Sequence, residues 1–441
     1  MSLRVGMISL GCPKNLVDAE IMLGHLREAG FAITAHLEEA EVIIVNTCGF
    51  ITPAKEESIE EILRLARYKE DGRCRVLLVA GCLAQRYPGE LMEEMPEVDG
   101  LLGTGMIHQV ARAVQRALAG ERVLAVGDPG CSYEGAAPRL RATPRYTAYL
   151  KIAEGCSNCC TYCAIPLIRG PYRSRPLEDV VAEARKLAAE GAREIILVAQ
   201  DTTRYGLDLY GQRSLPRLLK ELTEVPGITW LRLMYCHPEG ITEELIEVLS
   251  SSPKICRYID LPLQHASPAV LERMGRGATA GRLREIIGQL REAIPGLVMR
   301  TTFMVGFPGE REEDFQQLCD FMREMRFERA GLFKYSAEEG TPAAALPDQV
   351  PEEVKEERYH RAMSLQRQIS LAYHRSLVGT SRLVLVEGRR GRRYVGRSEG
   401  DAPEVDGRVI FSAHGSPLSP GEFVKVKITR AREYDLVGEL A

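Results

Sequence analysis

Three cysteines within eight residues constrain this 441-residue chain more than any other feature of its sequence. Cys156, Cys160 and Cys163 have the spacing C-x3-C-x2-C, and Tyr162 stands just before the last of them. A loop this short can place three thiolates around three corners of a [4Fe–4S] cluster, because soft sulfur ligands favour iron–sulfur clusters and zinc over hard cations. The fourth iron would lack a protein ligand from this loop. An open metal position is typical of a catalytic rather than a structural site.

Two other interpretations of these cysteines compete with a cluster. A zinc knuckle normally has a fourth Cys or His close by, and none follows within about the next seventy residues after Cys163. A disulfide knot is typical of secreted chains rather than of this one. Cys159 leaves an ambiguity, because Cys156 and Cys159 also have the spacing of a chelating pair.

The C-x3-C-x2-C spacing resembles that of the radical S-adenosylmethionine (SAM) enzymes. The resemblance implies that the open iron chelates the amino and carboxylate groups of SAM. One electron from the cluster then cleaves SAM to methionine and a 5′-deoxyadenosyl radical, which removes hydrogen from unactivated carbon. No side-chain acid or base can perform that step, so it is left to a cofactor. The order of the family's motif favours Cys156, Cys160 and Cys163 as ligands and leaves Cys159 as a bystander.

Composition sets the broad class of the chain. Its length predicts two to four domains, and 45% hydrophobic residues suffice for packed cores. The net charge of −4 provides no general attraction to nucleic acid or membranes. No apolar run approaches the roughly 20 residues that span a bilayer, and residues 1–10 predict a buried strand rather than a signal peptide. We therefore expect a cytoplasmic protein whose twelve cysteines serve metal binding and catalysis more than disulfides.

Hydrophobic patterning predicts an α/β fold of three domains. Residues 1–127 alternate short apolar runs with amphipathic stretches, which predicts a doubly wound parallel sheet with strands at 4–9, 42–46 and 75–80 and helices at 16–29 and 53–69. Residues 128–145, rich in Pro and Gly, predict a linker.

Residues 146–375 repeat a strand–helix pattern that predicts a partial (βα)6 barrel with a long trailing helix from 351 to about 377. Its strands are expected at 146–152, 194–199, 229–234, 258–263, 297–305 and 330–335. Residues 376–441 contain short β-like runs at 381–386, 394–396, 409–412, 423–428 and 435–439, which predict a small antiparallel barrel.

A second group of cysteines stands at the ends of the three strands predicted in the first domain. Cys12, Cys48 and Cys82 each adjoin a glycine, and they are 36 and 34 residues apart, about one βαβ unit each. Parallel strands bring their carboxyl ends to one edge of the sheet, where ligands bind. The repetition predicts a second cluster with three protein ligands. Cys74, Cys131, Cys236, Cys256 and Cys319 show no such pattern and are expected to be ordinary buried thiols.

The sequences around these cysteines resemble the methylthiotransferase family along essentially the whole chain. The matching motifs are Gly-Cys-Pro-Lys-Asn at 11–15, Asn-Thr-Cys-Gly-Phe-Ile at 46–51, Ala-Lys at 54–55, Glu-Ser-Ile at 57–59, and Gly-Cys-Leu-Ala-Gln-Arg-Tyr at 81–87. The C-terminal domain is similar to the TRAM β-barrel. The resemblance implies two [4Fe–4S] clusters and SAM used twice, as methyl donor and as radical source.

The motif at 11–15, with Ile-Pro at 165–166 and Ile-Arg-Gly at 168–170, is similar to that of the branch that acts on a ribosomal protein. That branch adds a methylthio group to the β-carbon of an aspartate in the twelfth protein of the small subunit. The alternative is a tRNA adenosine methylthiotransferase of the MiaB type, whose motif is Gly-Cys-Gln-Met-Asn. A third possibility, an RNA-binding protein with structural clusters, is disfavoured because both predicted sites leave an iron open.

Further site residues are expected where barrel strands end. We predict Gln200 and Glu310 as contacts of SAM, and Asp201, His237 and His265 at the same mouth. Arg169 and Arg173 follow the cluster loop and could hold a carboxylate, although a structural or solvated role is the favoured interpretation.

Partners are predicted less directly. An external electron donor is implied by the family. Arg389, Arg390, Arg392 and Arg393 form a basic patch that could contact RNA or could be a solvated hairpin tip. A basic loop of the ribosomal substrate is expected to meet acidic residues of the C-terminal domain, namely Glu399, Asp401, Glu404 and Asp406.

Overall fold

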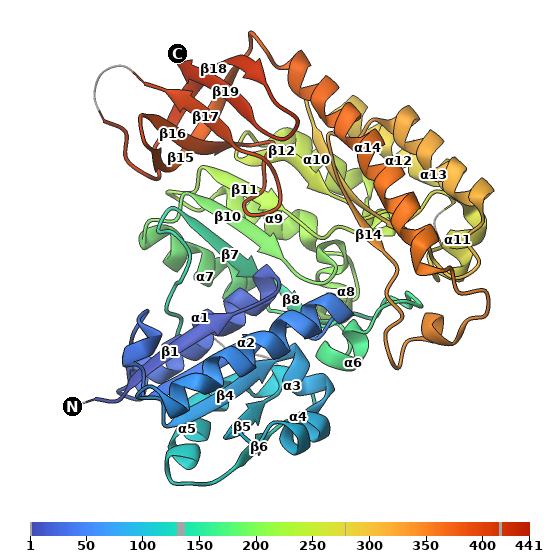
Figure 1. The fold of residues 1–441 in the computed structure, drawn as a ribbon. Helices are drawn as coiled ribbons and strands as arrows, with labels where there is room; N and C mark the ends of the chain where they lie inside the picture. Colours follow the sequence, from blue (N-terminus) through green and yellow to red (C-terminus); the bar gives the residue numbers. More distant parts are fainter. Residues whose placement is uncertain (1, 130–136, 278, 414–416) are drawn as a thin grey trace.

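The computed structural model describes residues 2–129, 137–277, 279–413 and 417–441. Two six-stranded sheets and a closed five-stranded barrel follow one another along the chain (Figure 1). The N-terminal unit lies below the central sheet in this view, and the C-terminal barrel lies at its other end. In the described ranges, no helix is both long enough and apolar enough to cross a membrane.

The first sheet is wholly parallel, with the order β2-β1-β3-β4-β5-β6. Its strands are β1 (Arg4–Ser9), β2 (Ala32–Ile33), β3 (Val42–Thr47), β4 (Val76–Gly81), β5 (Gly100–Leu102) and β6 (Val123–Ala125). Its helices are α1 (Pro13–Glu28), α2 (Thr52–Glu70), α3 (Cys82–Arg86), α4 (Pro88–Glu94) and α5 (Val110–Leu118). The predicted doubly wound sheet is confirmed; β2, β5 and β6 were not predicted, because two or three residues are too few to show a period.

Alternate residues of the buried strands face opposite layers. Val42 and Ile44 pack with α1 and α5, whereas Ile43 and Val45 pack with α2. A strand buried on both faces is a continuous apolar run, as residues 42–45 of β3 and 76–80 of β4 are. Because the chain order reverses at β1, the β1/β3 boundary is the point where ligands of such sheets bind.

Residues 137–145 of the predicted linker lie along α1. Glu20, whose side chain is fully buried, forms an ion pair with Arg139 and accepts the N–H groups of Ala142 at 2.7 Å and Thr143 at 3.1 Å. This segment is therefore docked on the N-terminal domain. Residues 130–136 of the linker, including Cys131, lie outside the described residues.

The central sheet has six parallel strands in consecutive order, with β7 and β14 at its edges. They are β7 (Thr147–Lys151), β10 (Glu194–Val198), β11 (Trp230–Leu233), β12 (Ile255–Asp260), β13 (Val298–Val305) and β14 (Arg329–Lys334). The helices are α6 (Ile165–Arg169), α7 (Leu177–Ala189), α8 (Leu207–Tyr210), α9 (Leu215–Thr223), α10 (Glu243–Ser251), α11 (Pro268–Arg273), α12 (Ala280–Ala293) and α13 (Glu312–Met325), and a short hairpin pairs β8 (Ala153–Glu154) with β9 (Arg173–Ser174).

The predicted partial barrel is confirmed, and β12 begins three residues before the predicted start. The outer residues of its strands pack against its own helices. The inner residues, such as Tyr149 and Tyr258, share a core with α1 of the N-terminal domain. The N-terminal domain therefore covers the inner face of the open barrel.

A long helix, α14 (Glu352–Ser376), leads to the C-terminal barrel. The barrel consists of β15 (Ser381–Arg390), β16 (Arg393–Ser398), β17 (Val409–Ser412), β18 (Phe423–Ala431) and β19 (Leu436–Leu440). One pair, β17 with β19, is parallel, so the barrel is not purely antiparallel as predicted. Glu194 of β10 pairs with Arg397 at 2.6 Å and Arg232 at 2.9 Å, which anchors the two domains.

The expectation that four acidic residues would be free to hold a substrate loop is wrong for two of them. Asp401 is buried in an ion pair with Arg329, and Asp406 accepts the Tyr258 hydroxyl at 2.8 Å and pairs with Arg300 at 2.9 Å. A buried carboxylate needs such a partner within the fold. These two carboxylates therefore join the C-terminal barrel to the central domain.

Candidate metal centre

The three cysteines of the N-terminal domain lie together at the carboxyl edge of adjacent strands β1, β3 and β4. A Cβ atom on Gly11, whose φ is +87°, would stand 2.9 Å from the Cβ and 3.2 Å from the Sγ of Cys48. One on Gly49 would stand 2.9 Å from the backbone oxygen of Cys82. Glycine is therefore required beside these cysteines because the strand-end loops touch.

Polar side chains from the same motifs hold the three loops. Asn15 donates to the carbonyls of Leu10 at 3.0 Å and Thr47 at 2.8 Å. Buried Ser58 accepts the N–H of Cys48 at 3.1 Å and donates to its carbonyl at 2.9 Å. The motif residues between the cysteines therefore position thiols rather than supply ligands.

Electrostatics differ among the three thiols. Burial would raise the pKa of Cys12, but Lys14, Arg169 and nearby backbone N–H groups lower it below its usual value. Burial raises the pKa of Cys48 to about 12, and the neighbouring Cys82 thiol adds to the effect. The thiols are thus close enough to influence one another. A metal cluster would be needed to hold all three as thiolates.

The barrel cysteines lie on a loop between β8 and α6. Gly155, with φ of +73°, is required because a Cβ there would stand 2.1 Å from the carbonyl oxygen of Pro171. The loop is held at its far side by Thr161, which donates from its N–H to the Met274 carbonyl at 3.0 Å and from Oγ1 to the Arg273 carbonyl at 2.8 Å. The end of α11 therefore supports the middle of the cysteine loop.

Exposure separates Cys159 from the other cysteines of this loop. Cys159 is exposed, Cys156 is buried, and Cys160 and Cys163 are half-buried. Burial raises the pKa of Cys163 to about 12, with Cys160 and then Cys156 contributing, so these three lie near one another. Arg276 donates to the Cys160 thiol at 3.8 Å.

Both donor sets have the chemistry of iron–sulfur ligands. Each has three thiols and a glycine-lined cradle. Across the described ranges, no three Cys, His, Asp or Glu side chains are arranged around one metal ion. Thiolates are the ligands that iron–sulfur clusters use, so the residues of each set suit the predicted cluster.

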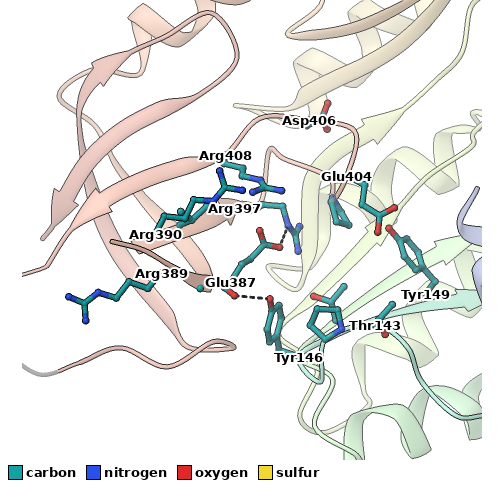
Figure 2. Close-up of a pocket in the computed structure, with 15 residues that line it drawn as sticks. Thr143, Tyr146, Tyr149, Glu387, Arg389, Arg390, Arg397, Glu404, Asp406 and Arg408 are labelled. Atoms are coloured by element: carbon teal, nitrogen blue, oxygen red, sulfur yellow. Dashed lines mark hydrogen bonds and ion pairs between the residues drawn. The ribbon is translucent and has the colours of Figure 1, made fainter. Parts of the chain in front are cut away.

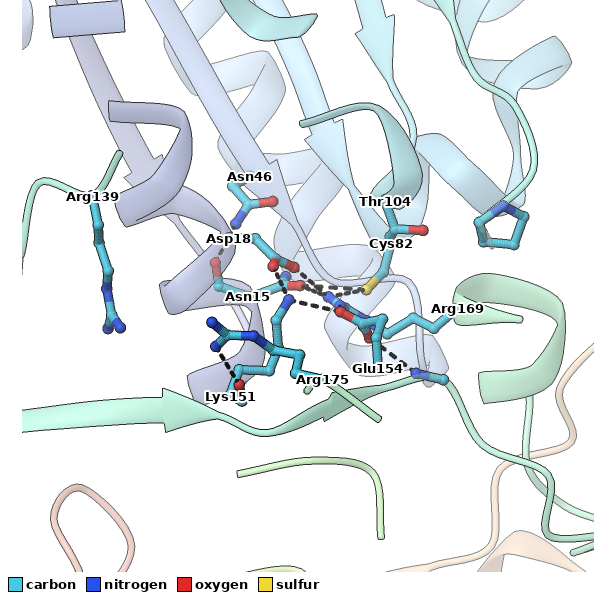
Figure 3. Close-up of polar contacts among 12 residues, drawn as sticks. Asn15, Asp18, Asn46, Cys82, Thr104, Arg139, Lys151, Glu154, Arg169 and Arg175 are labelled. Atoms are coloured by element: carbon cyan, nitrogen blue, oxygen red, sulfur yellow. Dashed lines mark hydrogen bonds and ion pairs between the residues drawn. The ribbon is translucent and has the colours of Figure 1, made fainter. Parts of the chain in front are cut away.

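The two cysteine sites share a wall. Cys82 is buried against Ala164 and Ile168, and Ala164 directly follows Cys163. Arg169, in the same helix, donates to the Cys82 thiol at 3.5 Å and to Asn15 Oδ1 at 2.5 Å (Figure 3). A helix that begins at one site therefore ends in contact with the other.

Arg169 is the centre of a buried ion network between the domains. It pairs with Asp18 of α1 at 3.0 Å and Glu154 of β8 at 2.9 Å, and Lys151 pairs with the same two carboxylates. The charges of Arg169 and Lys151 lower the pKa of Glu154, against the opposing effect of burial. Of the two predicted roles for Arg169, the structural one is thus observed, with two carboxylates of the fold as its partners. Arg173 is half-buried and donates to carbonyl oxygens.

A second clamp joins the cysteine loops to the barrel. The buried carboxylate of Glu338, which follows β14, accepts Lys55 at 2.8 Å and Arg86 at 2.9 Å. Arg86 also donates to the carbonyl of Gly49 at 2.9 Å. The motif residues after Cys48 and Cys82 therefore fasten the N-terminal site to the central domain.

The predicted SAM contacts occupy different surroundings. Gln200 is half-buried just beyond β10. Glu310 is buried, accepts the Gly306 N–H at 2.8 Å and pairs with Arg358 at 2.9 Å. Its carboxylate therefore orients the glycine loop at 306–310. His265 Nε2 lies 3.6 Å from it.

Two further residues of the mouth interact with the cysteine loop or with a charge near it. Asp201 accepts Asn158 of that loop at 3.0 Å. Burial lowers the pKa of His237 to about 4, and Arg276 adds to the effect. Cys74, Cys236, Cys256 and Cys319 are buried, as predicted for ordinary thiols.

Two site residues were not predicted, Lys14 and Tyr235. Lys14 Nζ lies 3.3 Å from the centre of the Tyr235 ring, just beyond β11 of the barrel. The signal in the sequence was the position of Lys14 two residues after Cys12. Nothing in the sequence indicated which barrel residue would face it.

Family models match three separate parts of the chain. Residues 4–103 match a family described as uncharacterized protein family UPF0004, residues 150–322 match the radical SAM superfamily, and residues 378–441 match the TRAM domain. The matches follow the order of the three domains in the structure.

Relatives align with the chain over its full length. The ribosomal protein uS12 methylthiotransferase RimO of Pelotomaculum thermopropionicum is 58% identical, covering 100% of this chain and 99% of the relative. The protein of the same name from Desulforudis audaxviator is 58% identical, covering 98% and 96%. That of Geobacter sulfurreducens is 51% identical, covering 99% and 98%.

Solved structures share the fold at low sequence identity. The radical SAM methyltransferase TsrM from Kitasatospora setae, with tryptophan and a SAM analog bound, has a TM-score of 0.59 at 16% identity, covering 85% of this chain and 90% of that one. The cobalamin-dependent SAM radical enzyme OxsB has a TM-score of 0.51 at 12% identity, covering 83% and 56%. These similarities concern the arrangement of domains alone.

Proposed function

The chain belongs to the family of ribosomal protein uS12 methylthiotransferases, and we propose that it adds a methylthio group to the β-carbon of an aspartate in that ribosomal protein. We assign one [4Fe–4S] cluster to Cys156, Cys160 and Cys163. A second is assigned to Cys12, Cys48 and Cys82. SAM is the cofactor, and its use requires an external electron donor.

When bound, the barrel cluster with SAM supplies a radical that removes hydrogen from carbon, and the second cluster supplies a place for sulfur. Residues of the chain hold the two cysteine sites next to each other. Asn15 and Ser58 hold the N-terminal thiols, and Thr161 holds the barrel loop. Gln200 is proposed to contact SAM, and Glu310 to act on the SAM side by orienting the 306–310 loop.

The contact of Cys82 with Ala164, Ile168 and Arg169 carries this proposal. Sulfur must reach a substrate carbon before the radical on that carbon is lost, which requires the two cluster sites to face the same substrate. A shared wall between the two cysteine sites supports this requirement. Structural clusters alone would need no such adjacency.

The competing function is methylthiolation of tRNA adenosine. The full-length relatives carry the uS12 name, which favours the ribosomal protein as substrate. The residues around the cysteines serve either chemistry, since both reactions use the same cofactors. Substrate choice therefore needs a direct assay.

A groove of about 390 Å³ lies between the C-terminal barrel and the central domain, and Glu387, Glu404 and Asp406 are among the residues that line it (Figure 2). Arg389, Arg390 and Arg408 line it, and Arg392 and Arg393 complete an exposed hairpin tip beside it. We propose that this surface contacts ribosomal RNA next to uS12, in the cytoplasm. Neutralising the hairpin arginines should weaken binding to ribosomes and lower its salt dependence.

The function is tested by offering both substrates to one preparation. Reconstituted enzyme with SAM, sulfide and reductant should add a methylthio mass to uS12, or to a peptide copied from its target loop. The same peptide with asparagine in place of the aspartate should stay unmodified, and so should tRNA carrying prenylated adenosine. Modified tRNA with an untouched ribosomal protein would instead establish the competing function.

A further inference from the structure

Lys14 is a buried cation at the junction of the two cysteine sites. It lies in the first turn of α1, two residues after Cys12, and only 6% of it is exposed. Its Nζ stands over the ring of Tyr235, which comes from the barrel. The side chain therefore reaches from the N-terminal site towards the mouth of the barrel.

The other buried cations between these two domains have carboxylate partners in the fold. Lys151 and Arg169 share Asp18 and Glu154, Lys55 and Arg86 share Glu338, and Arg139 and Arg175 share Glu183. Among the described residues, no hydrogen bond or ion pair involves the Lys14 ammonium. The ammonium lies over the face of an aromatic ring, and the charges of Cys12, Glu154 and Asp260 act on it without a hydrogen bond or ion pair.

Burying an ammonium without an anion is unfavourable, and contact with a ring face replaces only part of its hydration. Tyr235 is held in place for this contact. Its backbone is left-handed, with φ of +59°, and its N–H donates to Asp260 at 3.0 Å. A non-glycine residue in that conformation persists only where its surroundings impose it, and such residues concentrate at functional sites.

The nearby carboxylate of the barrel is already occupied. Asp260 accepts the Tyr235 N–H and lies 3.6 Å from Arg300. Cys12 and Cys48 are only half-buried, so the space at the N-terminal thiols is partly open. Lys14 has no hydrogen-bonded carboxylate among the described residues, and a carboxylate that enters beside the N-terminal thiols from outside the chain would supply one.

We propose that Lys14 binds the side-chain carboxylate of the target aspartate, with Tyr235 holding its ammonium in place. The inference rests on the proposed function, because it takes its substrate from there. The β-carbon of an aspartate is bonded directly to its carboxyl carbon. A clamp on the carboxylate therefore positions the carbon that receives sulfur, beside the cysteines that hold the second cluster.

The carboxylate of SAM is the other anion that reaches this region. Lys14 lies beside Cys12 of the N-terminal site, whereas SAM is assigned to the cluster of the barrel loop. The position of Lys14 therefore favours the carboxylate of the target aspartate over the carboxylate of SAM. The test measures the binding of SAM separately.

The test is a cycle that changes the enzyme and the peptide separately. The dissociation constant of a uS12 loop peptide, carrying either the target aspartate or asparagine, is measured for the wild-type holoenzyme and for the Lys14→Met holoenzyme. Methionine keeps the length of lysine without its charge, and it stands at this place in the tRNA-modifying motif. We expect Lys14→Met to weaken binding of the aspartate peptide by roughly 10- to 100-fold and to change binding of the asparagine peptide less than about twofold.

Controls separate this role from support of the cluster. Iron content, the reduction potential of the barrel cluster and the affinity for SAM should be unchanged in Lys14→Met, whereas the potential of the N-terminal cluster should fall equally with either peptide, because a positive charge beside Cys12 is removed. Lys14→Arg should recover most of the preference for aspartate, because it keeps the charge.

Three results would overturn the inference. The first is that Lys14→Met weakens binding of the aspartate peptide and the asparagine peptide equally. The second is that the variant loses iron or shifts a cluster potential while its binding of the aspartate peptide stays intact. The third is that it binds SAM more weakly while its binding of the peptide is unchanged. Each leaves the proposed function standing if the wild-type enzyme still modifies the aspartate peptide. A wild-type enzyme that modifies tRNA and no peptide refutes the proposed function and this inference together.

Discussion

The two cysteine sites are built in opposite ways. The barrel site uses one loop of eight residues, 156–163, supported within its own domain by Thr161 and Arg276. The N-terminal site needs three strand ends and an arginine from the other domain, Arg169. The first site is thus local and self-contained. The second exists only when the sheet is formed and the domains are docked.

This difference predicts a one-way dependence between the sites. Damage to the N-terminal thiols should leave the barrel loop intact, because the hydrogen bonds that support the loop come from Arg273, Met274 and Arg276 of its own domain. Damage to the interface should disturb the N-terminal site first, because Arg169 and Glu338 hold its loops. The predictions below test this asymmetry, from the largest expected effect to the smallest.

Loss of any barrel ligand should have the largest effect. Cys156→Ala, Cys160→Ala and Cys163→Ala should each reduce formation of 5′-deoxyadenosine to background, because a cluster with two thiolates is not retained. Chromatography of anaerobic reactions with dithionite measures this product. Cys159→Ala is the matched control and should keep most of the activity. A requirement for Cys159, with Cys160 dispensable, would show that the ligands are wrongly assigned.

Removing the three N-terminal thiols should halve the iron content of the protein. The combined Cys12→Ala, Cys48→Ala and Cys82→Ala variant is expected to hold half the iron of the parent, since one of two equal clusters is lost. Iron analysis with electron paramagnetic resonance of the reduced protein measures the loss. Equal iron in variant and parent would contradict a second cluster.

Removing Arg169 tests how the N-terminal site depends on docking. Arg169→Met leaves Asp18 and Glu154 buried with Lys151 as their shared cation, so the free energy of unfolding should fall by about 3–5 kcal/mol. Denaturant unfolding measures it. Arg284→Met removes the exposed pair with Glu324 and should change the same free energy by about 1 kcal/mol or less. If the two variants lost similar amounts of unfolding free energy, the ion network at the interface would not stabilise the fold more than an exposed ion pair does.

A smaller effect is expected from pH at the barrel mouth. Burial and Arg276 lower the pKa of His237 from 6.5 to about 4, so the folded protein holds it neutral while the unfolded chain binds a proton below pH 6.5. Stability should therefore fall as the pH drops from 6.5 towards 4, by about 2 kcal/mol at pH 5 from this residue. Comparing unfolding midpoints at pH 7.5 and pH 5 measures it.

His237→Asn should reduce that pH dependence. His360→Asn, at a histidine whose side chain is 68% exposed, is the control and should leave the pH dependence as in the parent. If His237→Asn kept the full dependence, the neutral, buried state of His237 would be refuted.

Local patterns predicted the two sheets, the C-terminal barrel and the two groups of cysteines. Runs such as 42–45 are apolar on both faces, and glycine–cysteine pairs recur at strand ends, so both signals lie within a few residues of sequence. The parallel pair β17·β19 and the burial of Asp401 and Asp406 were not predictable in this way. They depend on which segments meet after folding.

The same limit applies inside the site. Lys14 was visible beside Cys12, but its partner Tyr235 lies 221 residues further along the chain. Arg169 could be recognised as a possible carboxylate ligand, but its carboxylates come from β8 and from α1 of another domain. Contacts between domains are determined by tertiary packing, which periodicity and motif spacing do not report.

The division of labour between the sites can be measured in one reaction mixture. Mass spectrometry would follow 5′-deoxyadenosine and the methylthio form of the uS12 peptide with the triple variant at Cys12, Cys48 and Cys82. We predict that 5′-deoxyadenosine forms near the wild-type rate while no methylthio peptide appears. Methylthio peptide in that reaction, or the absence of 5′-deoxyadenosine, would contradict two sites with separate tasks.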